Sequence, residues 1–264
     1  SYEFSLLAPR AARSGAVHPV HSVDRFLPDG YCYVVIDLTE TPKFIYDNHS
    51  LKEIQSCRRV WFSGIRENYI TIPSGRESEM FIIYFQKGRA HPFVEIPMYE
   101  LTDTVVDGEL VLSSHILDLR DLLLETPDIQ QRFTKAASFL LQTFAGKLKM
   151  DPMVDYAVQQ ILRQPHALTI QHLSSEVGYS QKHLIKRFKD LVGITPKSLL
   201  KITRFQQTIA ELDKQQYSGW SHMALDCGYF DQAHFIHDFK NISGFTPGQY
   251  LAMQRDFTNY VAVG

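Results

Sequence analysis

One segment of the chain occurs twice. The pairs Gly178–Tyr179 and Thr195–Pro196 return as Gly228–Tyr229 and Thr246–Pro247, with apolar and basic residues repeated between them. The two glycines lie 50 residues apart and the two threonines 51 residues apart, so the second copy holds one more residue. A repeat of this length indicates a single supersecondary unit that is used twice.

Each copy predicts two short helices that are joined at the glycine. Apolar residues recur at helical spacing on both sides of Gly178 and Gly228, and glycine readily takes the left-handed conformation that ends a helix. Ser180 and Asp231 are expected to cap the second helix of each copy. The pattern is that of a helix-turn-helix unit. Two plain hairpins in an all-α domain are the alternative, which the repetition in register disfavours.

The first copy is strongly basic on its outer face. Residues 180–204 carry seven Lys or Arg and one acidic residue, Asp190, although the whole chain has a net charge of −2. The seven cations are Lys182, Lys186, Arg187, Lys189, Lys197, Lys201 and Arg204. Such clustering predicts a surface that binds phosphate, and a solvated face is the alternative.

These residues closely resemble the AraC/XylS family of bacterial transcription regulators. The resemblance covers about residues 151–255, and its most specific strings are GYSQKHLIKRFKDLVGITPKSLL (178–200) and GYFDQAHFIHDFKNISGFTPGQYL (228–251). It implies a seven-helix DNA-binding domain in which a long helix joins the two helix-turn-helix units. The starts Asp151–Pro152, Thr195–Pro196 and Thr246–Pro247 independently indicate three of these helices.

Carried over by position, the family's DNA-reading residues fall on the second helix of each copy. They are Gln181, Lys182, His183, Ile185, Lys186 and Arg187 in the first copy, and Gln232, Ala233, Ile236 and His237 in the second. Lys can donate to guanine, Gln matches adenine, and Ile can contact the methyl group of thymine. Contacts with the DNA backbone are expected from Ser180, Lys189, Lys197, Lys201, Arg204 and Lys240.

The chain before about residue 113 predicts short strands. Apolar and aromatic runs separated by turn residues favour a barrel or sandwich. The runs are Tyr31–Leu38, Lys43–Tyr46, Arg59–Phe62, Tyr69–Ile72 and Met80–Phe85. Two helices should follow, at His115–Leu124 and from a Thr126–Pro127 cap to about Leu148. The apolar face of the second helix could pair with its twin in a homodimer, or pack on the barrel or on the DNA-binding domain.

The sequence therefore predicts an α+β chain with three parts. A β-rich, cupin-like sensing domain spans residues 1–113, a helix pair spans 114–150, and an AraC-type DNA-binding domain spans 151–264. The order of these parts resembles the sensing and DNA-binding halves of the same family, and it motivates the hypothesis that a small molecule binds the barrel. The chain is expected to bind double-stranded promoter DNA and to contact RNA polymerase.

A cupin-like enzyme or a metal sensor that carries a DNA-binding tail is the second function class. His18, His21 and His91 are the candidate metal ligands, but they lack the spacing of a cupin metal site, so we expect no metal, no cofactor and no enzymatic activity. Cys32, Cys57 and Cys227 lack metal-type spacing and are expected in the core. With neither a signal sequence nor a long apolar run, the sequence predicts a cytoplasmic protein without membrane contact.

Overall fold

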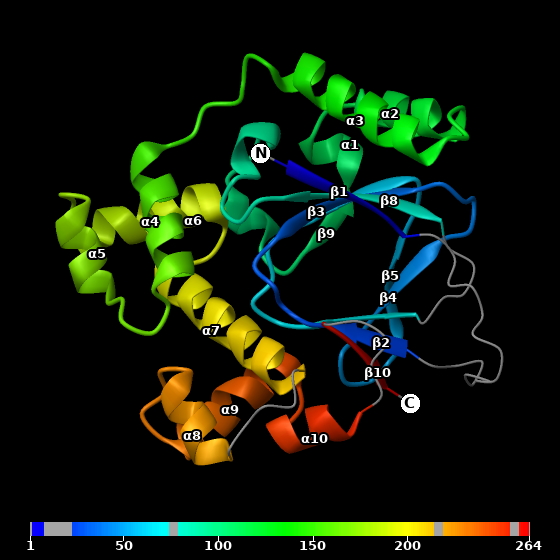
Figure 1. Ribbon diagram of the computed structural model, residues 1–264. Coiled ribbons are helices and arrows are strands. Elements are labelled where there is room, and N and C mark those ends of the chain that lie inside the picture. Colours follow the sequence, from blue (N-terminus) through cyan, green and yellow to red (C-terminus); the bar gives the residue numbers. More distant parts are fainter. Residues whose placement is uncertain (1, 8–22, 74–78, 214–218, 254–258, 264) are drawn as a thin grey trace.

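The structure is a computed structural model that describes residues 2–7, 23–73, 79–213, 219–253 and 259–263 (Figure 1). Strands make up most of its amino-terminal part, and helices make up most of the part after residue 107. This arrangement confirms the predicted α+β fold, with β-sheets first and a helical region after them.

The strands form two antiparallel sheets of five strands each, in the orders β1-β8-β3-β6-β9 and β10-β2-β7-β4-β5. Their bounds are β1 Tyr2–Leu7, β2 Val23–Phe26, β3 Cys32–Asp37, β4 Lys43–Tyr46, β5 Glu53–Cys57, β6 Val60–Ser63, β7 Ile70–Pro73, β8 Met80–Phe85, β9 Val105–Asp107 and β10 Tyr260–Val263.

The five predicted strands are all present. Two of them, β4 and β8, have the predicted bounds, and the other three differ by one residue at each end. Strands β1, β2, β5, β9 and β10 were not predicted. Strand β5 is a largely exposed edge strand, and β9 has only three residues, so neither has an apolar pattern long enough to recognise.

Three short helices and a helix pair follow or interrupt the strands: η1 His91–Phe93, η2 Met98–Leu101, α1 Gly108–Val111, α2 Ile116–Leu124 and α3 Ile129–Phe144. Helices α2 and α3 cover one face of the first sheet (Figure 1). The ring of Phe133 in α3 lies 5.3 Å from that of Phe81 in β8, and the ring of Phe144 lies 5.0 Å from that of Phe93.

The start and end of α3 differ from the prediction. Its cap is Asp128, whose side chain accepts a hydrogen bond from the amide of Gln131, and the helix ends at Phe144 rather than near Leu148. The hydroxyl of Thr126, the predicted cap, donates instead to the carbonyl of Leu122 in α2. Asp128 lies two residues after Thr126, and an aspartate carboxylate is a more favourable cap than a threonine hydroxyl for the free amides of the first turn.

The apolar face of α3 packs on the sheet. Ala136, Leu140 and Phe144 are each at most 3% exposed and belong to one core with the strands. Of the alternatives open from the sequence, packing on the barrel is therefore the one that the structure shows, and this face is not free to pair with a second copy.

The described residues after 150 contain seven helices, as the sequence predicts: α4 Pro152–Arg163, α5 Ile170–Glu176, α6 Gln181–Val192, α7 Pro196–Asp213, α8 Trp220–Asp226, α9 Gln232–Ser243 and α10 Pro247–Ala252. Asp151, Ser180, Asp231 and Thr246 cap α4, α6, α9 and α10 as predicted. Gly178 and Gly228 have φ angles of 73° and 72°, which confirms both predicted turns.

No helix within the described ranges is long and apolar enough to cross a membrane.

The last strand lies outside the helical region. Residues 260–263 were assigned to the DNA-binding domain, but they form β10, which pairs with β2 at the edge of the second sheet (Figure 1). The amide of Leu27, just after β2, donates to the carbonyl of Asn259 at 2.9 Å. The side chain of Leu27 is fully buried in a core shared with α7, α8, α9 and α10.

A second contact joins the end of α6 to η2. Gly193 has a φ of 103°, and a Cβ atom there would lie 2.7 Å from Ile65 Cγ2 and 3.1 Å from the carbonyl oxygen of Met98. Only glycine fits both this backbone conformation and this approach. The hydroxyl of Thr102 donates to the carbonyl of Gly193 at 2.7 Å, and Arg89 pairs with Asp155 of α4 at 2.7 Å. The helical region is thus held against the sheets at several points.

Candidate nucleic-acid interface

We call α5 with α6 the first reading unit, and α8 with α9 the second reading unit. In the first, α6 buries Leu184, Phe188 and Val192 and exposes most of its polar residues. Ser180 begins the helix, because its hydroxyl accepts a hydrogen bond from the amide of His183 at 3.3 Å. The same apolar spacing that predicts the helix therefore also decides which face is free for a ligand.

The free face of α6 is basic. Lys182, Lys186 and Lys189 are exposed, and none of them forms an ion pair in the part of the chain that the structure describes. Arg187 differs, since its Nε donates to the carboxylate of Asp151, the cap of α4, at 2.8 Å. Three unpaired ammonium groups along two turns of helix make a surface that attracts phosphate.

The other residues predicted on α6 differ in exposure. Gln181 and His183 are exposed near its first turn, whereas Ile185 is half-buried. The ring of His183 stacks on that of Tyr179 with centroids 4.8 Å apart and planes 16° apart. His183 therefore stacks on the tyrosine of the repeated Gly178–Tyr179 pair, a contact that was not predicted from the sequence.

The second reading unit is polar but less basic. Ala233 and His237 of α9 are exposed, and Gln232 and Ile236 are half-buried. The carbonyl oxygen of the Gln232 side chain accepts a hydrogen bond from the hydroxyl of Ser221 in α8 at 2.8 Å. Helix α8 thus fixes the position of one predicted reading side chain.

A buried carboxylate, Asp238, organises this unit and was not identified from the sequence. It is 7% exposed and pairs with Lys201 of α7 at 2.8 Å, while the rings of His234 and His237 lie 3.6 and 3.9 Å from its oxygens. The ion pair joins the long helix α7 to the second reading helix. In the sequence, Asp238 is recognisable only as an acidic residue among the apolar residues of the buried face of α9. Its partner becomes clear only when the position of α7 is known.

The residues predicted to contact the DNA backbone separate into two groups. Lys189, Lys197 and Lys240 are exposed, and Ser180 is exposed while it caps α6. Lys201 is held by Asp238, and Arg204 donates its Nε to the carbonyl of Pro165 at 2.7 Å. Lys201 and Arg204 therefore have roles inside the helical region, which makes them weaker candidates for phosphate contacts than the sequence suggested.

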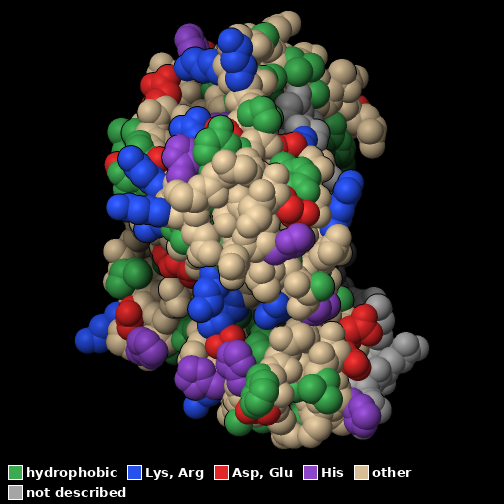
Figure 2. Space-filling model, turned by 90° about the vertical axis from the view of Figure 1, so that its left-hand side faces the viewer, with side chains coloured by type: hydrophobic (Ala, Val, Ile, Leu, Met, Phe, Trp, Pro, Cys, Tyr) green, Lys and Arg blue, Asp and Glu red, His purple; other side chains and the backbone are tan. Residues whose placement is uncertain are grey.

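Figure 2 shows the face of the molecule that carries these helices. Lys and Arg side chains occur along its length, and His side chains are most frequent in the lower part, at the height of α8 and α9 in Figure 1. This part of the chain includes His222, His234 and His237, all of them exposed. The face therefore offers cations and hydrogen-bond donors over both reading units.

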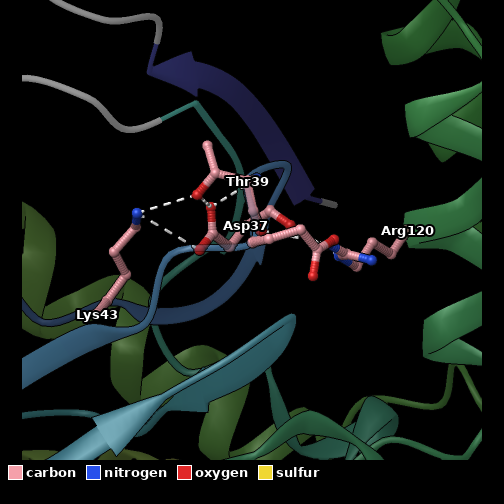
Figure 3. Close-up of polar contacts among 5 residues, drawn as sticks. Asp37, Thr39, Lys43 and Arg120 are labelled. Atoms are coloured by element: carbon pink, nitrogen blue, oxygen red, sulfur yellow. Dashed lines mark hydrogen bonds and ion pairs between the residues drawn. The ribbon is translucent and has the colours of Figure 1, made fainter.

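A separate hollow of about 200 Å³ lies on the β-rich part and is lined by Asp37, Thr39, Glu40, Thr41, Arg58 and Arg59. In Figure 3, Lys43 of β4 and Arg120 of α2 lie on opposite sides of Asp37, one of these lining residues. Lys43 pairs with Asp37 at 3.6 Å, and the Nε of Arg120 donates to the carbonyl of Asp37 at 2.8 Å. The buried polar groups at this hollow bond to one another. We therefore interpret them as structural contacts that join α2 to the sheet.

The residues considered for metal binding are not brought together by the described structure. No group of three or more His, Cys, Asp or Glu side chains in the described ranges could hold a metal ion, and His18 and His21 lie outside those ranges. His91 is half-buried in η1, and burial lowers its pKa. Cys32, Cys57 and Cys227 are buried and unpaired, as predicted, and burial raises the pKa of each thiol.

Two family models match the chain. Residues 173–253 match a family described as a helix-turn-helix domain, and residues 13–107 match a domain of unknown function, DUF6597. The first match begins within α5 and ends after α10, so it includes the second reading unit and all of the first except the start of α5.

The curated relatives are helix-turn-helix regulators. An uncharacterized regulator from Haemophilus influenzae is 33% identical over 101 residues, which is 38% of this chain and 34% of that protein. The activator RclR from Escherichia coli is 30% identical over 104 residues, or 39% of this chain and 36% of RclR. The chain thus matches only about a third of the length of these relatives.

Solved structures give similarities of lower identity. ToxT from Vibrio cholerae with a bound unsaturated fatty acid is 13% identical, with 97% of each chain covered and a TM-score of 0.48. The DNA-binding domain of AdpA in complex with a target DNA is 21% identical, with 39% of this chain and 92% of that chain covered and a TM-score of 0.35. The helix-turn-helix match at residues 173–253, the regulators among the relatives and the repeated unit with its caps support the predicted resemblance of this part of the chain to the AraC family of transcriptional regulators.

Proposed function

We propose that this protein is a transcription regulator, not an enzyme, that binds double-stranded promoter DNA through both reading units. The observation that carries the proposal is the paired arrangement of α6 and α9. Each is a capped helix that follows a left-handed glycine turn and turns a polar face outward. Two such helices can enter successive major-groove segments on one side of B-DNA, about 34 Å apart.

The first reading unit supplies most of the electrostatic attraction in this proposal. Lys182 and Lys186 would read base edges together with Gln181, His183 and Ile185, and Lys189 and Lys197 would contact phosphates. Because the three free lysines of α6 are exposed and unpaired within the described structure, their charge is available to DNA. Arg187 would contribute after exchanging Asp151 for a DNA partner.

The second reading unit would add sequence preference with little net charge. Gln232, Ala233, Ile236 and His237 would face the bases, and Lys240 the backbone. Asp238 and Lys201 would hold α9 at a fixed angle to α7, which sets the distance between the two reading helices. Rigid support of this kind is what precise groove readout requires.

We further propose that the β-rich part regulates DNA binding, as a site for a small-molecule effector. Its support is the direct packing of this part on both units, through η2 at the end of α6 and through Leu27 in the core around α9. A regulator of this kind would act in the cytoplasm and contact RNA polymerase there. A homodimer would need a face other than the covered side of α3.

Selection of bound duplexes from a randomised DNA library, followed by measurement of affinity against salt concentration, tests the proposed function. A recovered site should contain two short blocks about one helical turn apart, bound at least a thousandfold more tightly than a scrambled duplex. Binding without enrichment of any sequence would contradict specific readout.

The variant Lys186→Ala tests the assignment of the first reading helix. It should weaken binding to the selected site by about 1 to 3 kcal/mol and relax the preference at one base pair. Lys52→Ala is the matched control, because Lys52 is an exposed lysine on the β-rich part. If both variants bind like the wild type, α6 does not read bases through Lys186.

A further inference from the structure

An exposed aromatic residue stands directly before the cap of each reading helix. Tyr179 precedes Ser180 and is 51% exposed, and Phe230 precedes Asp231 and is 89% exposed. When the two units are aligned on their caps, these aromatics occupy the same position. Alignment on the glycines hides this equivalence, because the second unit has one additional residue in its turn.

Because the second unit has one additional residue, one aromatic side chain of its turn is buried and the next one is exposed. Tyr229, which follows Gly228, is 5% exposed and packs edge-on against the ring of Phe235, with centroids 5.4 Å apart. The turn therefore already has the aromatic anchor that its core needs. Phe230 does not belong to that core, and its side chain is exposed to solvent.

The location of Phe230 indicates which kind of partner it could contact. Recognition helices of helix-turn-helix proteins meet base edges with their amino-terminal residues, so a side chain just before the cap lies next to the groove. Gln232, two residues further on, is held by Ser221 of α8 at the same end of α9. Phe230 is thus continuous with the face proposed to read DNA.

The chemistry of the two aromatics differs. Tyr179 carries a hydroxyl group, which can bond to a phosphate, whereas Phe230 has no polar atom in its side chain. In the major groove the apolar group that distinguishes one base pair from another is the 5-methyl group of thymine, and Phe is among the side chains that contact it.

We propose that Phe230 is a specificity-determining residue that contacts the methyl group of a thymine in the half-site bound by the second reading unit. This inference rests on the proposed function, since it requires that α9 lies in the major groove. It adds an aromatic contact to a helix whose predicted reading residues are two polar and two aliphatic side chains.

Replacement of single thymines by deoxyuridine in the selected duplex tests the proposal, because this change removes only the methyl group. For the full-length wild type, replacement of one thymine in the second half-site should weaken binding about fourfold, the contribution of one buried methyl group. Phe230→Ala should bind the thymine duplex several-fold more weakly and should no longer respond to that replacement.

Leu110→Ala is the matched control, since Leu110 is a 75% exposed apolar residue of α1, outside both reading units. It should keep the wild-type response to deoxyuridine. Because both side chains are exposed, both variants should unfold at the wild-type temperature, which separates a lost contact from a lost fold.

Two results would overturn the inference without touching the proposed function. Phe230→Ala could bind as tightly as the wild type, or it could lose affinity equally on both duplexes and so keep the full response to deoxyuridine. The last result would indicate contact with the sugar backbone. Failure of the wild type to prefer any sequence would instead contradict the proposed function itself.

Discussion

Asp29 is a buried carboxylate beside the junction of the sheets with α7. It is 8% exposed, and it accepts hydrogen bonds from the amide of Tyr31 at 3.1 Å and from the hydroxyl of Tyr33. Burial raises its pKa from 3.8 to about 6, and the bonds from Tyr33 and Tyr31 offset part of that effect. The next residue, Gly30, lies against Leu199 of α7, so this acid is close to the helical region.

The raised pKa of Asp29 predicts a specific dependence of stability on pH. Between about pH 4 and pH 6 the folded protein keeps a proton that the unfolded chain has released. The associated stabilisation, about 3 kcal/mol, is present below pH 4 and lost as the pH rises through 6. Asp29→Asn keeps an acceptor and removes this proton site, so its stability relative to the wild type should increase from pH 4 to pH 7 in urea unfolding.

Asp121→Asn, which removes an exposed carboxylate of α2, is the control for this measurement. Its unfolding free energy should run parallel to that of the wild type over the same range. Parallel curves for Asp29→Asn as well would show that Asp29 does not bind a proton in the folded state near pH 6.

At the scale of single elements, the caps determine where the reading helices begin. The carboxylate of Asp231 accepts from the amide of His234 at 2.7 Å, and the hydroxyl of Ser180 does the same for His183 at 3.3 Å. These bonds satisfy amide groups that have no partner within the helix. The cap of α9 also lies next to Phe230 and Gln232, so it positions the end of the helix that we propose reads DNA.

Asp231→Ala should therefore lower the free energy of unfolding by about 1 kcal/mol and weaken specific DNA binding. Asp231→Ser should restore most of both quantities, because serine caps the equivalent helix α6. Asp226→Ala removes an exposed acid at the end of α8 and should leave both near the wild-type values. Loss of DNA binding in Asp231→Ser would indicate that the charge, and not the cap, is what matters.

At the scale of the whole molecule, the second reading unit and the sheets share one core. Leu27 precedes the sheet residue Cys32, yet it is buried among side chains of α7 and α9, and Val261 of β10 is fully buried in the same cluster. The amide of the Gln206 side chain in α7 donates to the carbonyl of Pro28 at 2.6 Å. A change in the sheets can thus reach α9 without an intervening linker.

This shared core predicts that the β-rich part and the second reading unit unfold together. The chain has two tryptophans, Trp61 in β6 and Trp220 in α8, so Trp61→Phe and Trp220→Phe leave one fluorescent reporter in each region. Both reporters should show the same midpoint in urea. Leu27→Ala should lower both midpoints together, at a cost of about 2 to 5 kcal/mol.

Leu124→Ala, a change at a 42% exposed position of α2, should leave both midpoints almost unchanged. Two separate transitions, of which Leu27→Ala shifts only one, would show that the two regions are independent despite their contact.

Much of the helical region and of the candidate site could be predicted from the sequence because it depends on short-range effects. Gly178 and Gly228 mark the turns, the caps mark the helix starts, and the apolar stripe of α6 leaves its lysines outside. Each of these features acts over a few residues, so local spacing is sufficient to recognise it. The mistaken cap of α3 shows the limit, since Thr126 and Asp128 both have the right chemistry and only the backbone decides between them.

The amino-acid pattern by itself determined the repeated unit, its basic face and the presence of strands before the helices. Only the tertiary structure decided that Tyr260–Val263 complete a sheet that begins at the other end of the chain, that Lys201 pairs with Asp238, and that Leu27 belongs to the core of the second reading unit. These contacts join residues far apart in sequence. Their partners are chosen by which surfaces meet after the elements have formed, and no local pattern records that choice.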